Sequence, residues 1–309
     1  MENIPPVAVN ESGTMPENNA SSDRPSVSSP TIAVLPAWRF NMWSKKHTLS
    51  LVILLVILGA IPIAAKFEWR ATTAGIGFGM WIGILIILIL VMVVIGHGVV
   101  HRYSGVYIDE RNKMSLSRFQ LLLWTLVIIS ALLAMVFLNI ISGQTNPADI
   151  LVPDPIWALL GISVGTAVAQ PIINSNTASN LADQGEKNRQ IEQMQKMAGE
   201  TKEAITSKVI FTGQLVKNCD PSQATISNLF RGDEIGNFLS IDFSKVQSFL
   251  FTFLVVLGYG AAIGNQVIST TALHSLPSIG TNIAALIGVS QGGYLLYKAA
   301  PHSTTPLPS

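Results

Sequence analysis

Four long stretches without a charged residue constrain this chain more than any other feature. No Asp, Glu, Lys or Arg occurs in 71–101, 119–148, 155–182 or 246–297. Each stretch exceeds the ~20 residues that an apolar helix needs to cross a bilayer. Only 12% of all residues are charged, whereas a typical soluble domain carries about 25%. The sequence therefore predicts an all-α integral membrane protein whose first partner is the lipid bilayer.

Apolar runs and turn residues divide the chain into six expected transmembrane helices. They fall at about 47–65, 75–98, 118–141, 155–172, 245–267 and 282–299. Pro171 should kink or end the fourth, because proline cannot donate the helical hydrogen bond. The first helix pair with its polar loop occupies 37–114. Residues 1–36, rich in Ser, Pro and Asn, are expected to be a disordered cytoplasmic tail, and 301–309 a second tail.

Part of the sequence occurs twice. Residues 117–125 read Ser-Arg-Phe-Gln-Leu-Leu-Leu-Trp-Thr, and 244–252 read Ser-Lys-Val-Gln-Ser-Phe-Leu-Phe-Thr, which sets an offset of 127. The same offset pairs 158–165 with 285–292 without a gap. We interpret 115–173 and 244–300 as two copies of one transmembrane hairpin. Because both copies would enter the membrane from the same side, the repeat is parallel.

Each copy begins with the pattern Ser-x-x-Gln, which is typical of a helix capping box. Ser117 with Gln120, and Ser244 with Gln247, are therefore predicted to cap their helices. A second interpretation, in which both glutamines line a shared site at the pseudo-symmetry axis, stays open. The cations after the two serines, at 118 and 245, are expected to reach lipid phosphates on the cytoplasmic side.

The distribution of cations predicts the orientation. With the N-terminus inside, only Lys66 and Arg70 of the 19 Lys and Arg residues fall outside. Cytoplasmic segments of membrane proteins carry the excess of Lys and Arg, so both termini are expected inside. A bacterial cytoplasmic membrane is the expected location, because the apolar segments follow no cleavable leader and the outer loops are short.

Small residues recur on three of the expected helices. They form ridges of the kind that supports close helix packing and homo-oligomerisation, and they are Gly75, Gly79, Gly83, Gly161, Gly165, Gly288 and Gly292. Polar residues lie away from these ridges on the fourth and sixth helices. They are Ser163, Thr166, Gln170, Asn174, Ser290 and Gln291. These side chains either line an aqueous path or hydrogen-bond to neighbouring helices, and the second arrangement is the commoner one.

Several functional classes lack their sequence patterns. The chain contains no phosphate-binding loop, no nucleophile elbow and no metalloprotease motif, so neither enzymatic activity nor a cofactor is predicted. His97 and His101 have metal-compatible spacing but no third ligand beside them, so no metal site is expected. The single Cys219 cannot form an internal disulfide, and a net charge of +1 gives no reason to expect nucleic acid as a partner. The expected helix cores hold no charge, which argues against coupled transport.

One sizeable polar segment, 174–243, is expected to be cytoplasmic and helical. Its first half, 180–208, should form a helix, and 226–235 an amphipathic helix at the membrane interface. The leading functional hypothesis is an oligomeric pore or channel-like effector gated through this segment. The alternative is a membrane anchor or scaffold that recruits a cytoplasmic protein through 174–243. An uncoupled small-solute carrier is the third hypothesis.

Overall fold

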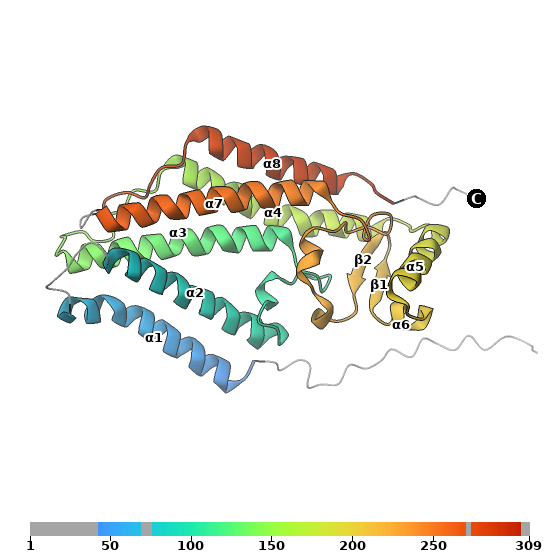
Figure 1. The fold of residues 1–309 in the computed structure, drawn as a ribbon, viewed down its shortest axis with the longest axis horizontal. Helices are drawn as coiled ribbons and strands as arrows, with labels where there is room; N and C mark the ends of the chain where they lie inside the picture. The colour runs from blue at the N-terminus through green and yellow to red at the C-terminus, as the bar shows by residue number, and fades with distance from the viewer. Residues whose placement is uncertain (1–42, 69–75, 270–272, 304–309) are drawn as a thin grey trace, which may run out of the picture. The chain divides into compact units, whose positions relative to one another are not determined.

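The computed structural model describes residues 43–68, 76–269 and 273–303, without the side chains of 65–68 and 269. The predicted tail 1–36, Gly75 and most of the tail 301–309 lie outside the described residues. The described part is mostly helical, and six long helices account for most of it (Figure 1). They are α1 (Lys45–Glu68), α2 (Ile76–Val100), α3 (Leu116–Ile141), α4 (Asp154–Ser179), α7 (Phe243–Ser269) and α8 (Thr281–Ala299).

Five of these helices are long and apolar enough to cross a membrane, namely α1, α2, α3, α4 and α7. They indicate a multi-pass membrane protein. The sixth expected span is helical as α8 but is not among the five, because it carries polar residues that include Ser290, Gln291 and Lys298. Pro171 does not end α4, which continues to Ser179.

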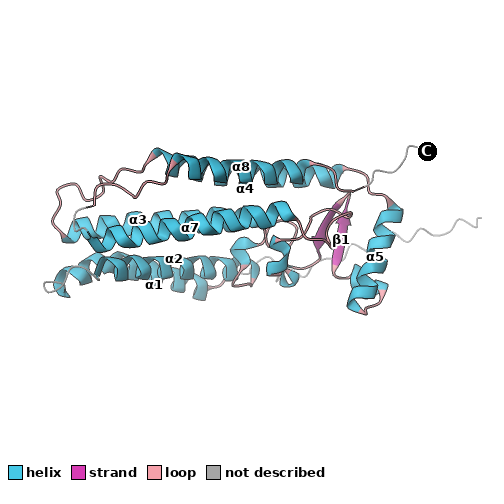
Figure 2. Cartoon of the chain, turned by 45° about the horizontal axis from the view of Figure 1, so that its top comes forward, coloured by secondary structure: helices cyan, strands magenta, loops and turns pink. Residues whose placement is uncertain are grey.

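Four helices form a closed ring of contacts. α3 packs against α4 and α7, and α8 packs against the same two helices, so each of the four has two neighbours in the ring. We call α3, α4, α7 and α8 the four-helix unit. α2 covers α3 and α7, and α1 packs on α2 and α3 (Figure 2). The core of this arrangement contains the fully buried side chains of Ile84, Trp124, Ile156 and Ile287.

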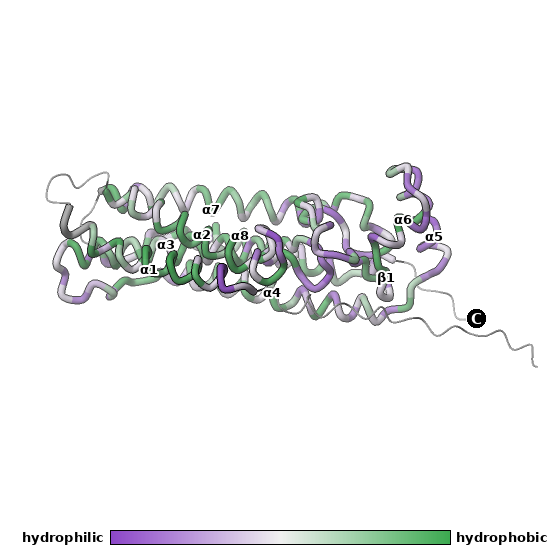
Figure 3. The backbone as a smooth tube through the Cα atoms, turned by 90° about the horizontal axis from the view of Figure 1, so that it is seen from below, coloured by the Kyte–Doolittle hydropathy of each residue, from purple (hydrophilic) through white to green (hydrophobic). Residues whose placement is uncertain are grey.

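Residues 180–242 form a small polar module between α4 and α7. Its elements are α5 (Gln184–Ala198), α6 (Lys202–Thr206), β1 (Val209–Thr212), β2 (Leu215–Asn218) and the one-turn helices η3 (Pro221–Gln223) and η4 (Ile226–Leu229). The tube in Figure 3 is mainly hydrophobic along the long helices and turns hydrophilic along α5. Val216, Ile235 and Phe238 form the module's own buried cluster.

The module is less helical than the sequence predicted. Helices do form within 180–208, but Gly199 ends α5 in the left-handed conformation, with φ of 66°. An antiparallel hairpin of β1 and β2 follows, in which Thr212 pairs with Leu215 across a two-residue turn. Gly213 opens that turn with φ of 54°, a conformation that glycine adopts without strain. The prediction of an interfacial helix over 226–235 is wrong beyond η4, because the chain turns there and Arg231 forms a bridge with Ile241.

Candidate functional site

The chain enters α3 and α7 through two loops of the same build. In the first, the one-turn helix η2 (Gly105–Tyr107) precedes an isolated bridge between Ile108 and Met114. In the second, η4 precedes a bridge between Arg231 and Ile241. In the first loop, Ser115 just before α3 donates its backbone N–H to the carbonyl of Tyr107 at 2.8 Å. In the second, Asp242 just before α7 donates its backbone N–H to the carbonyl of Phe230, also at 2.8 Å.

These loops correct the predicted capping boxes. The residue that caps α3 is Ser115, whose Oγ accepts from the backbone N–H of Arg118. Asp242 caps α7, because its Oδ1 accepts from the backbone N–H groups of Ser244 and Lys245 at 3.0 and 3.2 Å. Ser115 and Asp242 are 127 residues apart in the sequence, so the two caps keep the offset of the repeated stretch.

The serines predicted as caps therefore lie inside the first helical turn. Ser117 donates its hydroxyl to Gln170 instead, and Ser244 donates its hydroxyl to Asp242. The glutamines of the two patterns also differ, since Gln120 is buried and Gln247 is exposed. A site shared by both glutamines is thus not formed.

Both first-turn cations contact protein groups; Lys245 is buried and so does not reach lipid phosphates as expected, whereas Arg118 stays half-exposed. Arg118 donates to the carbonyl of Ile108 at 2.5 Å, and Lys245 donates to the carbonyl of Arg231 at 2.6 Å. Each cation also lies near a carboxylate two residues further along its loop, which is Glu110 for Arg118 and Asp233 for Lys245. The pair of Arg118 with Glu110 is half-exposed at 3.6 Å, whereas Lys245 and Asp233 form a buried pair at 2.9 Å.

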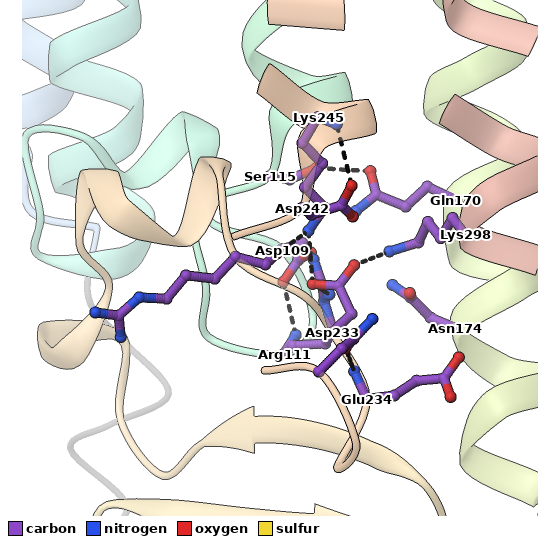
Figure 4. Close-up of polar contacts among 12 residues, drawn as sticks. Asp109, Arg111, Ser115, Gln170, Asn174, Asp233, Glu234, Asp242, Lys245 and Lys298 are labelled. Carbon is purple, nitrogen blue, oxygen red and sulfur yellow. Dashed lines mark hydrogen bonds and ion pairs between the residues drawn. The ribbon is translucent and has the colours of Figure 1, made fainter. Parts of the chain in front are cut away.

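Asp233 is the centre of a buried ion cluster (Figure 4). Its carboxylate pairs with Arg111 at 2.5 Å, with Lys245 at 2.9 Å and with Lys298. Arg111 also pairs with Asp109 at 2.6 Å. These side chains come from the loop before α3, the polar module, the start of α7 and the end of α8. The Asp233 cluster, as we call these five residues, therefore joins the module to the four-helix unit.

The charges around Asp233 favour its ionised form. Burial opposes ionisation of Asp233, but the charges of Arg111, Lys245 and Lys298 outweigh it and hold the pKa of that carboxyl well below its usual range. Replacing such a cluster by apolar groups can be neutral, but removing one partner leaves an uncompensated buried charge. The cluster thus fixes one arrangement of the module on the helix ends.

The predicted polar face of α4 points into the four-helix unit. Ser163, Thr166, Gln170 and Asn174 are all buried. Gln170 Oε1 accepts from the hydroxyl of Ser115 at 2.7 Å, and Asn174 Nδ2 donates to Oε1 of Glu110 at 2.9 Å; Thr166 bonds within its own helix. These residues therefore agree in part with the expectation that the polar face of α4 hydrogen-bonds to neighbouring segments.

The polar contacts continue across the unit. Gln120 Nε2 on α3 donates to the hydroxyls of Ser248 and Thr252 on α7, at 3.0 Å each. Gln291 Nε2 on α8 donates to the same Thr252 hydroxyl at 3.4 Å. Side chains from all four helices thus form one polar column that starts next to the Asp233 cluster.

Many buried polar atoms near this column have no protein partner among the described residues. They are Gln120 Oε1, Trp124 Nε1, Ser163 Oγ, Gln170 Nε2, Asn174 Oδ1, Tyr259 OH, Ser290 Oγ, Gln291 Oε1 and Tyr294 OH. All four helices of the unit contribute at least one. Buried polar groups that lack a protein partner are normally satisfied by water. The interior of this half of the unit is therefore chemically suited to hold water.

The other half of the unit is closed by an apolar layer. Ile156 and Leu159 of α4, Met135 of α3, Ile263 of α7 and Ile287 of α8 are all buried to 1% exposure or less. Each lies within about two helical turns of its helix end remote from the module, but their depths differ: counted along the helices from the contacts of Thr252 with Gln120 and Gln291, Ile287 lies about 6 Å deeper and Met135 about 22 Å deeper. The polar column thus gives way to a thick apolar layer.

The predicted glycine ridges are mostly unused within the chain. A methyl group added at Gly79, Gly83, Gly161, Gly165 or Gly292 would meet no atom of another described segment within 4 Å. At Gly288 it would lie 3.3 Å from the side chain of Ile162, where α8 approaches α4.

Three of the five histidines gather where α1 begins and α2 ends. His97 Nδ1 lies 2.9 Å from His47 Nε2, and the rings of Tyr103 and His101 flank His97 at 4.9 and 5.6 Å. No group of three or more His, Cys, Asp or Glu fit for a metal ion is found in the described ranges. Cys219 is a free, half-buried thiol.

Sequence reasoning missed the Asp233 cluster. Its members lie up to 189 positions apart, from Asp109 to Lys298, and no local pattern links them. One indication was present: Lys298 is the only charged residue of α8, yet in the predicted orientation it counts only as one of the cytoplasmic cations.

Comparison of the chain with known protein families, curated proteins and solved structures gave no significant match.

Proposed function

We propose that this protein is a channel-like membrane effector whose path runs through the four-helix unit and is gated by the polar module. The observation that carries the proposal is the set of buried polar atoms without protein partners, contributed by α3, α4, α7 and α8. Chains of such groups inside a membrane protein commonly border a hydrated path. The lining is uncharged, so it sets no strong ion preference.

The apolar layer acts as the closed gate in this proposal. A hydrophobic constriction excludes water and thereby blocks ions even where the backbone leaves space. The Asp233 cluster supports coupling between the module and the gate, because Lys245 and Lys298 belong to the same helices as Ile263 and Ile287. A shift of the module would therefore move α7 and α8.

The proposal includes six spans, both termini inside and a parallel duplication of the hairpin. The shared build of the two entry loops supports the duplication, because their caps keep the offset of 127. The unused glycine ridges support a homo-oligomer, since small residues allow helices of neighbouring chains to approach closely.

Ion flux through liposomes that contain the full chain tests this function. Ile287→Ser places a hydroxyl in the apolar layer, and we expect it to raise K⁺ and Cl⁻ flux about tenfold or more by wetting the gate. Val289→Ser is the matched control, because Val289 on the same helix is 75% exposed. If folded I287S protein conducts no better than V289S protein, the channel proposal is wrong.

A membrane scaffold remains the second candidate, favoured by exposed apolar side chains on the polar module. Leu181 and Met197 are more than 70% exposed there, as residues at a protein interface often are in the free subunit. Absence of flux in both variants, together with loss of a captured cytoplasmic protein in Met197→Asp, would favour this function.

A further inference from the structure

The polar module contains a cavity that the proposed path does not use. Its volume is about 160 Å³, room for about five water molecules at ~30 Å³ each. The cavity lies between the β-hairpin, the one-turn helices η3 and η4 and the loop that leads into α3. Its polar lining consists of Lys113, Asn218, Gln223, Thr225, Asn228 and Arg231.

Lys113 is the unusual member of this lining. It is only 6% exposed, and its ammonium makes no hydrogen bond or ion pair with any described residue. A buried ammonium normally requires a partner, because desolvation of the charge is costly. The neighbouring carboxylate Asp233 is already shared by three other cations. Lys113 is therefore a buried donor that faces the cavity without an anion of its own.

Backbone pairing holds Lys113 in this position. Asn112, in the left-handed conformation with φ of 56°, exchanges two hydrogen bonds with Asn218 of β2, at 2.8 and 2.9 Å. The backbone N–H of Asn218 also donates to the carbonyl of Arg111. The segment before Lys113 is thus fixed to the hairpin.

The rest of the lining suits an anion. Arg231 and Thr225 are exposed residues of the lining, and the Thr225 hydroxyl bonds to that of Ser227; Asn228 accepts from the Thr225 N–H through Oδ1, which leaves its amide N–H groups for the cavity. The side chain of Gln223 has a buried Oε1 without a protein partner, and a flip of its amide would present N–H groups to the cavity. Lysine and arginine together with neutral donors are the usual ligands of phosphate groups.

We propose that this cavity binds a small tetrahedral oxyanion, either free phosphate or the phosphate group of a small ester, with Lys113 as its buried ligand. The cavity also has apolar walls, which include Val216 and Phe238, and these would cover the carbon part of an ester. The inference goes beyond the channel proposal, because binding can be measured on protein that conducts nothing.

The charges around Lys113 make the binding depend on pH. Burial lowers the pKa of Lys113 to about 7, and the charges of Arg111 and Lys245 act in the same direction, against Asp233 and Asp109. Arg231 faces the same cavity. An anion beside Lys113 stabilises the ammonium, so binding takes up a proton, and affinity falls as the pH rises above about 7.

Calorimetric titration of the full chain in detergent tests the proposal, with sodium sulfate as the probe, because sulfate is doubly charged over the whole pH range used. Chloride at equal ionic strength is the blank. We expect saturable binding of one sulfate per chain and at least tenfold weaker binding by Lys113→Met. Lys196→Met is the matched control, because Lys196 is an exposed lysine of the same module outside the cavity lining. It should bind like the unchanged protein.

Two further variants test the proposal even if K113M is misfolded. Asn228→Asp adds a negative charge to the lining and should also weaken sulfate binding. Lys113→Arg keeps a positive charge and should remove the loss of affinity between pH 6 and 9. Absence of saturable binding, or equal affinity in K113M and K196M, would overturn the proposal. If glycerol 3-phosphate binds more tightly than phosphate, the site is assigned to a phosphate ester. If the two bind equally, the site is assigned to free phosphate.

Discussion

Asp233 is the residue on which the junction between module and helices depends most. Asp233→Asn removes the only carboxylate that Arg111, Lys245 and Lys298 share. We expect the free energy of unfolding to fall by about 3–5 kcal/mol, because the buried Lys245 and Lys298 lose their carboxylate partner, although Arg111 keeps Asp109. Thermal unfolding of the full chain in detergent measures this change.

The surface ion pair of Lys208 with Glu200, half-exposed at 2.5 Å, provides the control. Glu200→Gln should change stability by less than about 1 kcal/mol, because solvent screens exposed pairs. Equal effects of D233N and E200Q would contradict a structural role for the Asp233 cluster.

Lys113 should destabilise the folded protein in the absence of an anion. Its pKa is about 7 in the folded chain, below the ordinary value of 10.5, so the unfolded chain binds more protons between these two pH values. Stability should therefore rise with pH across this window. We expect Lys113→Met to unfold at a temperature several degrees higher than the unchanged protein at pH 6–7.

That advantage should shrink as the pH rises towards 10, where Lys113 is neutral in the folded protein, and vanish only above 10.5, where Lys113 is also mostly neutral when unfolded. Unfolding temperatures in chloride buffers from pH 6 to 10 test this. A constant difference between the two proteins across the range would show that Lys113 is not buried as a charge.

At the residue level, sequence reasoning identified the polar face of α4 but not the ion cluster. Helical periodicity placed Ser163, Thr166, Gln170 and Asn174 on one side, and the structure buries that side. The cluster forms only when the loop before α3, the module and two helix ends meet. A sequence pattern that describes one helix at a time contains no information about this contact.

The helices were the most predictable elements, because long apolar runs dominate their sequences. Their starts were less predictable. Ser-x-x-Gln gave a plausible cap two residues late, whereas Ser115 and Asp242 cap the real helices through hydrogen bonds from the following turn. Ser115→Ala should therefore cost about 1 kcal/mol of stability, measured by thermal unfolding. A smaller loss than in Thr201→Ala, which removes the cap of the exposed short helix α6, would contradict the assignment.

The β-hairpin was predictable from a pattern that the sequence analysis did not use. The apolar runs of β1 and β2 flank Gly213 and Gln214, and a glycine at this position is typical of a two-residue hairpin turn. Gly213→Ala should destabilise the module strongly. The new methyl group would lie 2.2 Å from the carbonyl oxygen of Ala178 at the end of α4, in addition to the strained φ.

Gly199→Ala is a matched comparison, because it has a similar φ of 66° but meets no atom within 4 Å. It should cost only about 1 kcal/mol, the usual penalty of a left-handed alanine. Hydrogen exchange of the β1 and β2 amides distinguishes the two. Equal protection in both variants would show that the hairpin does not rest on α4.

For the whole molecule, the orientation in the membrane is the prediction with the widest consequences. In a background with Cys219→Ser, Met197→Cys reports on the module, and Leu151→Cys reports on the loop between α3 and α4. Both positions are exposed, at 72% and 67%. We expect a membrane-impermeant maleimide to label L151C from outside, and M197C only after the membrane is opened. Labelling of both from one side would exclude the proposed topology.

The Asp233 cluster also sets an order of events during synthesis. Chains emerge from the N-terminus, so Asp109 and Arg111 are made early, Asp233 and Lys245 follow, and Lys298 comes last. Until Lys298 is in place, Asp233 lacks one of its three cations and the ring of four helices is still open. A chain that stops before the end of α8 would therefore keep Asp233 one cation short, with α4 and α7 lacking their shared neighbour.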